Sequence, residues 1–210
     1  NLKFQENIDF LKNLNPDWEY TLYDDKDIVS YIEKHYGKEI LSIYSKINPK
    51  YGAARADFFR YLLMYREGGV YFDIKSAISN PLSNVILPDD EYILSYWDSP
   101  FQTRYINNKN GEFQQWHVIC RPHHPFLYAV INKVIENINN YDIKTTGTGK
   151  LGVLKVTGPI AYSNAILPEL HKHKHRIVEI NDMIGLIYNN ISSNHENLFS
   201  KTLDFYKIVL

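Results

Sequence analysis

The sequence predicts an α/β protein, a three-layer sandwich in which helices cover a largely parallel sheet. Short apolar segments with strand character alternate with segments of helical periodicity along the chain, which is typical of this class. The chain has 210 residues, of which 44% are hydrophobic and 14% aromatic, so it can bury a substantial core. No repeat or low-complexity linker divides it. We therefore expect residues 1–210 to form a single domain, and the start at Asn1 is expected of a segment excerpted from a longer chain.

Several segments have the periodicity or the boundaries of helices. In residues 51–69, Ala54, Phe58 and Leu62 fall on one face, and Gly68-Gly69 is a typical helix stop. The acidic residues that open 24–37 are suited to cap a helix, and Gly37 is suited to end it. The predicted helices are 4–14, 24–37, 38–47, 51–69, 124–138 and one that begins at 157.

The predicted strands are short apolar runs bounded by turn residues. They cover residues 18–23, 70–74, 91–97, 114–120 and 176–180, with extended structure over 182–188 and a turn at 80–82.

Composition and charge exclude some partners. The net charge is −1 and the sequence pI about 6.8, which offers no electrostatic attraction for nucleic acid or for an anionic membrane surface. No apolar run approaches the roughly 18 residues of a membrane-spanning helix. Cys120 is the single cysteine and has no internal partner, which fits a reducing compartment. We expect a cytoplasmic protein of a bacterium or a virus-infected cell, or a Golgi lumenal one if an N-terminal anchor has been removed.

Four charged residues are predicted to meet at the end of strand 70–74. Asp73 and Lys75 are two apart and point to the same side, and Asp57 and Arg60 share one face of the preceding helix. The Gly-Gly turn folds that helix back beside the strand. Carboxylates accept hydrogen bonds from sugar hydroxyls and cations neutralise diphosphate, so this set suits a sugar nucleotide. The alternative is a surface pair of Asp57 with Arg60 and a turn-forming Asp73.

Residues 53–82, "AARADFFRYLLMYREGGVYFDIKSAISNPL", resemble the sugar-binding region with a DXD motif of glycosyltransferases. This family includes yeast α-mannosyltransferases, capsular polysaccharide enzymes and, more distantly, the clostridial glucosylating toxins. Similar elements at 15–28, 124–127, 157–159 and 192–199 extend the resemblance over nearly the whole chain. It implies a GT-A-type fold that transfers a sugar from a UDP- or GDP-sugar to a carbohydrate or glycoprotein acceptor, commonly with retention. The family's first strand would precede residue 1, so the expected sheet lacks it.

The resemblance also implies roles for individual residues. Asp57 and Arg60 would bind the sugar or ribose of the donor, and Asp73 would contact ribose and the metal shell. Tyr71 stands where the family often has tyrosine, with simple packing as the alternative. The second acid of the motif, usually a direct ligand of Mn²⁺ or Mg²⁺, is Lys75 here.

Two hypotheses on the metal follow from this lysine. The ammonium of Lys75 replaces the cation wholly or in part, because it can stand against the β-phosphate as a point charge. In the rival hypothesis a cation still binds through Asp73, the diphosphate and a tail residue such as His195 or Asn194.

Further candidates lie outside the motif. Asp98 follows the strand 91–97 and would face the acceptor hydroxyl, and Gln115 would hydrogen-bond the donor sugar; a structural role is the alternative for both. Gly158, at the start of a helix, would offer backbone N–H groups to a phosphate. The lysines of "HKHKHR" (171–176) would repel a cation, so this tract is interpreted as a solvated loop.

Two classes of function remain. The first is an NDP-sugar-dependent glycosyltransferase. The second, favoured by Lys75 and the missing strand, is a catalytically weak nucleotide-sugar-binding module of a larger glycan-synthesis protein.

Overall fold

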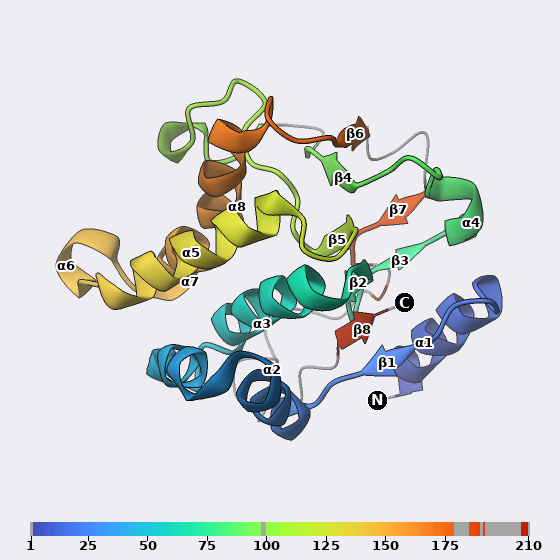
Figure 1. Ribbon diagram of the computed structural model, residues 1–210, viewed down its shortest axis with the longest axis horizontal. Coiled ribbons are helices and arrows are strands. Elements are labelled where there is room, and N and C mark those ends of the chain that lie inside the picture. The colour runs from blue at the N-terminus through green and yellow to red at the C-terminus, as the bar shows by residue number, and fades with distance from the viewer. Residues whose placement is uncertain (1, 98–99, 179–184, 190, 192–206, 210) are drawn as a thin grey trace.

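The computed structural model describes residues 2–97, 100–178, 185–189, 191 and 207–209. Six strands form one sheet in the order β1-β8-β2-β5-β4-β6, and Figure 1 shows them stacked from β6 at the top to β1 at the bottom. A second sheet pairs β3 with β7. The strands are β1 (Thr21–Leu22), β2 (Gly69–Asp73), β3 (Ala77–Ile78), β4 (Tyr92–Ser95), β5 (His117–Cys120), β6 (Arg176–Val178), β7 (Leu186–Ile187) and β8 (Lys207–Val209).

The helices account for most of the remaining regular structure. They are α1 (Leu2–Leu14), α2 (Asp25–Lys46), α3 (Gly52–Glu67), α4 (Leu82–Val85), α5 (Pro125–Asn139), α6 (Ile143–Thr146), α7 (Gly149–Val156) and α8 (Pro159–Ile166), with 3₁₀ turns η1 (Thr103–Tyr105) and η2 (Leu167–Glu169). In the described part of the chain, none of the helices is both long and apolar enough to span a membrane.

The prediction of a mostly parallel sheet is wrong. Among the described strands of the six-stranded sheet, β4 and β6 are the one parallel pair; β1–β8, β2–β8, β2–β5 and β4–β5 are antiparallel. These pairings give β1, β2, β4 and β6 one common direction and give β5 and β8 the opposite one. A strand buried on both faces is a continuous apolar run whichever way it points, so the pattern predicted the strands but not their directions.

The common direction of four strands still creates a shared edge. The carboxyl ends of β1, β2, β4 and β6 lie at the edge where the reversed strand β5 begins. We call it the carboxyl edge. Asp73, at the end of β2, and Gln115, just before β5, both belong to it.

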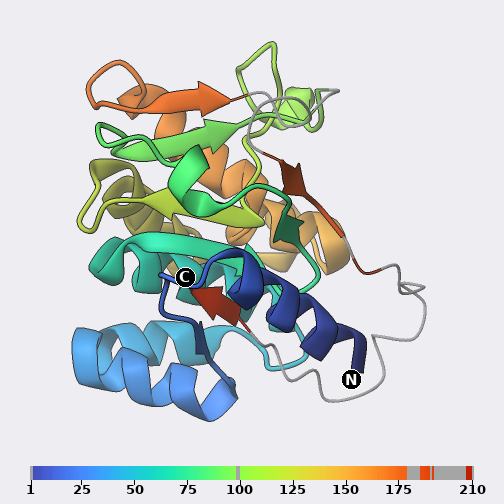
Figure 2. The same cartoon turned by 90° about the vertical axis from the view of Figure 1, so that its right-hand side faces the viewer.

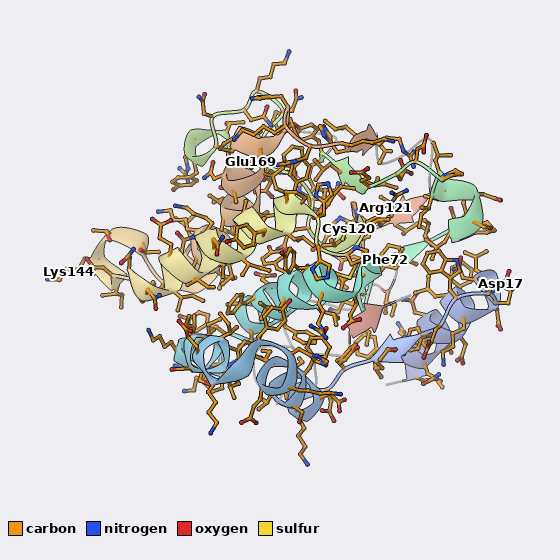
Figure 3. All side chains as sticks on the ribbon, viewed as in Figure 1. Asp17, Phe72, Cys120, Arg121, Lys144 and Glu169 are labelled. Atoms are coloured by element: carbon orange, nitrogen blue, oxygen red, sulfur yellow. The ribbon has the colours of Figure 1, made fainter. Side chains whose placement is uncertain are left out.

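The sheet has a hydrophobic core on each face, as alternation along a strand requires. Tyr71 packs with α2, α3, α5 and α8 on one face, whereas its neighbours Val70 and Phe72 pack with α1, α4 and the β3–β7 pair on the other. Figures 1 and 2 show the helices α2, α3 and α5 on one side of the sheet and α1 crossing the other side. In Figure 3 the side chains of Phe72 and Cys120 lie in the interior, between the outlying Lys144 and Asp17. The three layers predicted from sequence are therefore present.

Most of the predicted elements are confirmed. Helices cover 2–14, 52–67 and 125–139, and Asp24 caps α2 through hydrogen bonds from the backbone N–H groups of Lys26 and Asp27. The predicted division of residues 24–47 at Gly37 is confirmed, because α2 contains two helical stretches that meet at Gly37, whose φ of 75° is not helical. The pattern missed short elements, β3, α4, α6, α7 and β8, which carry too few residues to show a period.

Two glycines with positive φ provide a matched test of backbone strain. Gly68 ends α3 at φ 66°, and a Cβ there would lie 2.6 Å from Pro122 Cδ; Gly37 has φ 75° and open space around its Cβ position. We expect Gly37→Ala to cost about 1–3 kcal/mol from strain alone. Gly68→Ala should cost at least about 1 kcal/mol more, because the methyl group overlaps Pro122. Urea denaturation measures both, and equal losses would contradict the predicted overlap.

Candidate functional site

A buried arginine joins the helix α3 to the end of strand β2. The Nη2 atom of Arg60 lies 3.0 Å from Asp57 Oδ1 and 3.0 Å from Asp73 Oδ1. Its Nη1 atom donates a hydrogen bond of 2.5 Å to the carbonyl of Gln115. The guanidinium also stacks over the ring of Tyr71, 4.8 Å from its centroid. Arg60 thus holds four residues from three elements at the carboxyl edge.

Asp57 and Arg60 are not a surface pair. Their side chains are only 5% and 4% exposed, so this alternative from the sequence is wrong. Burial raises the pKa of the Asp57 carboxyl, while the charge of Arg60 opposes the rise. Burial alone would lower the pKa of Arg60, but the neighbouring Asp73 and Asp57 raise it above its usual value, so the guanidinium stays charged.

Hydrogen bonds fix the Asp57 carboxylate from both sides. Its Oδ1 accepts from Nε2 of Gln115 at 3.1 Å, and its Oδ2 accepts from Oγ1 of Thr157 at 3.0 Å. The hydroxyl of Tyr61 completes the network, because it donates toward Gln115 Oε1 at 3.0 Å and the Thr157 carbonyl at 2.9 Å. The lone pairs of Asp57 are therefore largely used inside the protein, and this carboxylate is a structural support of the site.

Asp73 is the exposed acid of the cluster. Its side chain is 37% exposed, and its Oδ1 accepts a hydrogen bond of 2.8 Å from the hydroxyl of Tyr71. Burial raises the pKa of Tyr71 well above its usual value, so this hydroxyl stays a donor. Arg60 and Tyr71 together hold Oδ1, which leaves the second oxygen of Asp73 on the solvent side as a potential hydrogen-bond acceptor.

Two predicted donor contacts have internal partners instead. The side-chain amide of Gln115 binds Asp57, as described above, rather than pointing away from the protein. The N–H of Gly158, at the start of α8, donates to the carbonyl of Val153 at 2.9 Å. The Gln115 amide is thus engaged in a tertiary contact, whereas the Gly158 N–H is engaged in a local bond at the end of α7.

Lys75 lies in the turn after β2 and is partly buried. Burial lowers the pKa of its ammonium. It lies two residues beyond Asp73, at the same edge of the sheet. The predicted roles of Asp98 and His195, and of Asn194, lie outside the described residues.

The described residues fit a divalent cation poorly. No group of three or more His, Cys, Asp or Glu side chains within the described ranges is arranged to hold a metal. Asp57 is buried and bonded, one oxygen of Asp73 is taken, and Lys75 stands where the motif has its second acid. Hard cations need several oxygen ligands, and this set supplies one available carboxylate oxygen.

A cavity lies on the far side of Thr157. Its volume is about 170 Å³. Its wall is largely apolar and has no acidic side chain, so it does not suit a sugar diphosphate. The lining residues are Lys46, Ile47, Asn48, Tyr51, Ala54, Ile138, Tyr141, Gly147, Thr148, Gly149, Gly152, Val153, Val156 and Thr157.

Sequence reasoning missed several residues of the site. Residue 157 is predicted only as the start of a helix, although a threonine there is a potential side-chain donor. Tyr61 lies on the predicted helix 51–69, and helical periodicity carries no signal for its hydroxyl. Their contacts join residues 100 and 96 positions apart and form through the packing of α3 against the α7–α8 junction.

In open α/β sheets, ligands commonly bind at the edge where strands end, which is where this charged cluster lies. Comparison with known proteins shows what the chain is similar to. Residues 2–93 match the family described as "Glycosyltransferase sugar-binding region containing DXD motif". The chain is thus related to these glycosyltransferases, as the resemblance at 53–82 predicted.

Named relatives agree with this relationship. The initiation-specific alpha-1,6-mannosyltransferase of Schizosaccharomyces pombe is 27% identical over 173 residues, covering 75% of this chain and 42% of that protein. The enzyme of the same name from Candida albicans is 28% identical over 210 residues, covering 86% and 53%. The chain spans about half the length of these relatives.

A solved structure shares the fold. The PaToxG glycosyltransferase aligns with a TM-score of 0.50 and 18% identity, covering 80% of this chain and 65% of that one. At this identity the likeness concerns the fold alone, a mixed α/β arrangement.

Replacing Arg60 tests the central contact. We expect Arg60→Met to lower the free energy of unfolding by about 3–5 kcal/mol, because it leaves Asp57 buried beside Asp73 without a cation. Arg55→Met is the matched control on the same helix: Arg55 is half-buried and bonds the carbonyl of Ile47, so about 1 kcal/mol is expected. Asp57→Asn should recover part of the loss in the Arg60→Met background. Similar losses at both arginines would show that the cluster does not stabilise the fold.

Proposed function

We propose that residues 1–210 form one catalytic domain of GT-A type that transfers a sugar from a UDP- or GDP-sugar to a glycan acceptor, with retention. The observation that carries the proposal is Asp73. It is half-exposed, held by Arg60 and Tyr71 at the carboxyl edge, and lies inside the region matched to the sugar-binding family. The names of the relatives favour mannose as the transferred sugar.

The charge of the cluster indicates which part of the donor each residue contacts. Asp57, Arg60 and Asp73 together carry a net charge of −1, which disfavours phosphate and favours hydroxyl groups as ligands. The outer oxygen of Asp73 is therefore assigned to a ribose or sugar hydroxyl. Lys75, in the following turn, supplies the positive charge for the diphosphate. Arg60, with both terminal nitrogens bonded inside the protein, positions Asp73 rather than touching the donor.

In the proposed transfer, one bond forms at the anomeric carbon and one bond breaks there. The oxygen of an acceptor hydroxyl forms a bond to the anomeric carbon as the bond from that carbon to the diphosphate oxygen breaks. The electron pair leaves with the nucleoside diphosphate, and the hydroxyl proton passes to the leaving phosphate. A cation fixed beside the leaving group stabilises the negative charge that develops there.

The family implies Mn²⁺ or Mg²⁺, which as a Lewis acid supplies the same stabilisation when bound. We propose that Lys75 takes over this role wholly or in part, since only one oxygen of the described cluster is available to a metal. A cation held by Asp73, the diphosphate and His195 is the rival proposal.

A binding module without turnover is the alternative to the enzyme, and it is favoured because Lys75 stands in place of the second acid. The cytoplasmic or Golgi location stays a prediction.

Asp73→Asn tests the enzyme against the module. We expect the protein to hydrolyse GDP-mannose or another donor of a UDP- and GDP-sugar panel slowly, and a bound donor to raise its melting temperature. Asp73→Asn should weaken donor binding about 10- to 100-fold, because it removes a hydrogen bond to a charged acceptor. Asp17→Asn, an exposed acid after α1, is the control and should change neither. Donor binding without hydrolysis would favour the module, and no binding across the panel would refute both.

Replacing Lys75 tests the proposed exchange of metal for lysine. We expect EDTA to leave the donor affinity of the protein unchanged, and Lys75→Met to weaken it about tenfold from loss of a charged contact. Lys75→Asp recreates two acids at the motif's spacing and should make donor binding dependent on Mn²⁺. Calorimetric titration with and without Mn²⁺ measures all three. Strict Mn²⁺ dependence of the unmodified protein would refute the lysine proposal.

A further inference from the structure

Aromatic side chains gather at the carboxyl edge beside the charged cluster. The ring of Trp97, after β4, lies 5.9 Å from that of Phe101 and 5.1 Å from that of Tyr188, with interplanar angles of 87° and 82°. Trp116 directly precedes β5, and its ring lies 5.5 Å from that of Tyr188. We call Trp97, Phe101 and Tyr188 the aromatic wall.

The aromatic wall faces solvent although it is apolar. Phe101 is 49% exposed and Tyr188 is 45% exposed. A single exposed ring needs no explanation, but contiguous exposed rings around a tryptophan are typical of a binding surface. Tyrosine and tryptophan are also suited to ligands with both an apolar face and hydroxyl groups.

The aromatic wall adjoins the proposed donor site. Burial raises the pKa of Tyr188, and the charge of Asp73 raises it further while Arg60 acts in the opposite direction. The geometry gives the same placement: the ring of Tyr188 lies 5.5 Å from that of Trp116, and the carbonyl of Trp116 accepts a hydrogen bond of 2.8 Å from the backbone N–H of Asp73. A ligand lying on the aromatic wall would lie next to Asp73.

Two buried polar atoms behind the aromatic wall have no good partner. The Nε1 of Trp97 and the Oε2 of Glu112 make no hydrogen bond of normal geometry in the described structure, although the indole is near enough to lower the pKa of Glu112 against the effect of burial. Glu112 is 6% exposed. Because both atoms are buried and the indole acts on the Glu112 carboxyl, this pair positions Trp97 within the aromatic wall and offers no group that a ligand on the surface reaches.

The chain position of these residues separates them from the donor-binding region. The match to the sugar-binding family ends at residue 93, whereas the aromatic wall and Glu112 all follow it. They lie near β4 and β5 of the six-stranded sheet and after β7 of the two-stranded sheet.

We propose that the aromatic wall binds the acceptor, a hexose-containing glycan. The apolar C–H face of a pyranose ring packs on the exposed rings of Phe101 and Tyr188. This inference rests on the proposed function, since it places the acceptor beside the donor held at Asp73. Phe101 and Tyr188 are thereby specificity-determining residues, and Trp97 positions them.

The test compares acceptor and donor constants in the same variants. We expect Phe101→Ala and Tyr188→Ala each to raise the KM for a mannose oligosaccharide about 3- to 10-fold, from the loss of one ring contact. The donor Kd should stay within about twofold, since neither ring is assigned to the donor. Tyr188→Phe keeps the ring and should restore the acceptor KM. Tyr128→Ala removes an equally exposed ring from α5 and is the control.

A second measurement needs no turnover. Binding of the mannose oligosaccharide to the full chain is followed by tryptophan fluorescence, in the unmodified protein and in the same variants. Binding that Phe101→Ala and Tyr188→Ala weaken, in a protein that neither binds nor hydrolyses any donor, would support the acceptor site and refute the proposed function. Donor binding without oligosaccharide binding would overturn the acceptor site and leave the proposed function standing. Equal effects of Tyr188→Ala and Tyr128→Ala would also overturn it.

Discussion

The site depends on one buried cation. Arg60 bridges Asp57 and Asp73 at 3.0 Å each and holds the carbonyl that precedes β5. Burying a guanidinium and a carboxylate is costly unless both are paired and hydrogen-bonded, and here Gln115 and Thr157 complete the carboxylate. The contact ties α3, β2, β5 and the α7–α8 junction to a single point. The contact fixes the position of the Asp73 carboxylate at the carboxyl edge.

The residues of the charged cluster differ in exposure and therefore in role. Asp57 and Arg60 are interior residues that hold Asp73 in place, and Asp73 is the one of the three that is exposed to a ligand. Lys75 changes the electrostatics of this edge, because a positive charge replaces the second acid of the family motif. Under the proposed function, this ammonium stands against the phosphate in place of the metal cation that the second acid of the motif would bind.

The two sides of the edge differ in character. The charged cluster lies on α3 and β2, within the segment matched to the sugar-binding family. The aromatic wall comes from later segments that follow β4 and β7. Under the two proposals, the charged surface takes the donor and the aromatic surface the glycan acceptor. Asp73 ends β2 and Trp97 follows β4, two strands with a common direction, so the two surfaces lie at one edge of the sheet.

The sequence by itself determined which residues could meet and what they could do. The helical spacing of Asp57 and Arg60, the Gly68-Gly69 stop and the apolar strand before Asp73 predicted one helix–turn–strand unit with its charges on one side, and the motif within it predicted the family. These are local relations, and periodicity and turn chemistry report them directly. The tertiary structure alone decided the strand directions, the burial of Asp57 and Arg60, and the partners of Gln115 and Thr157. Those features depend on contacts between segments far apart in the chain, such as Phe72 with His117 and Tyr71 with Val209, and no local pattern records which of many compatible packings buries the apolar faces best.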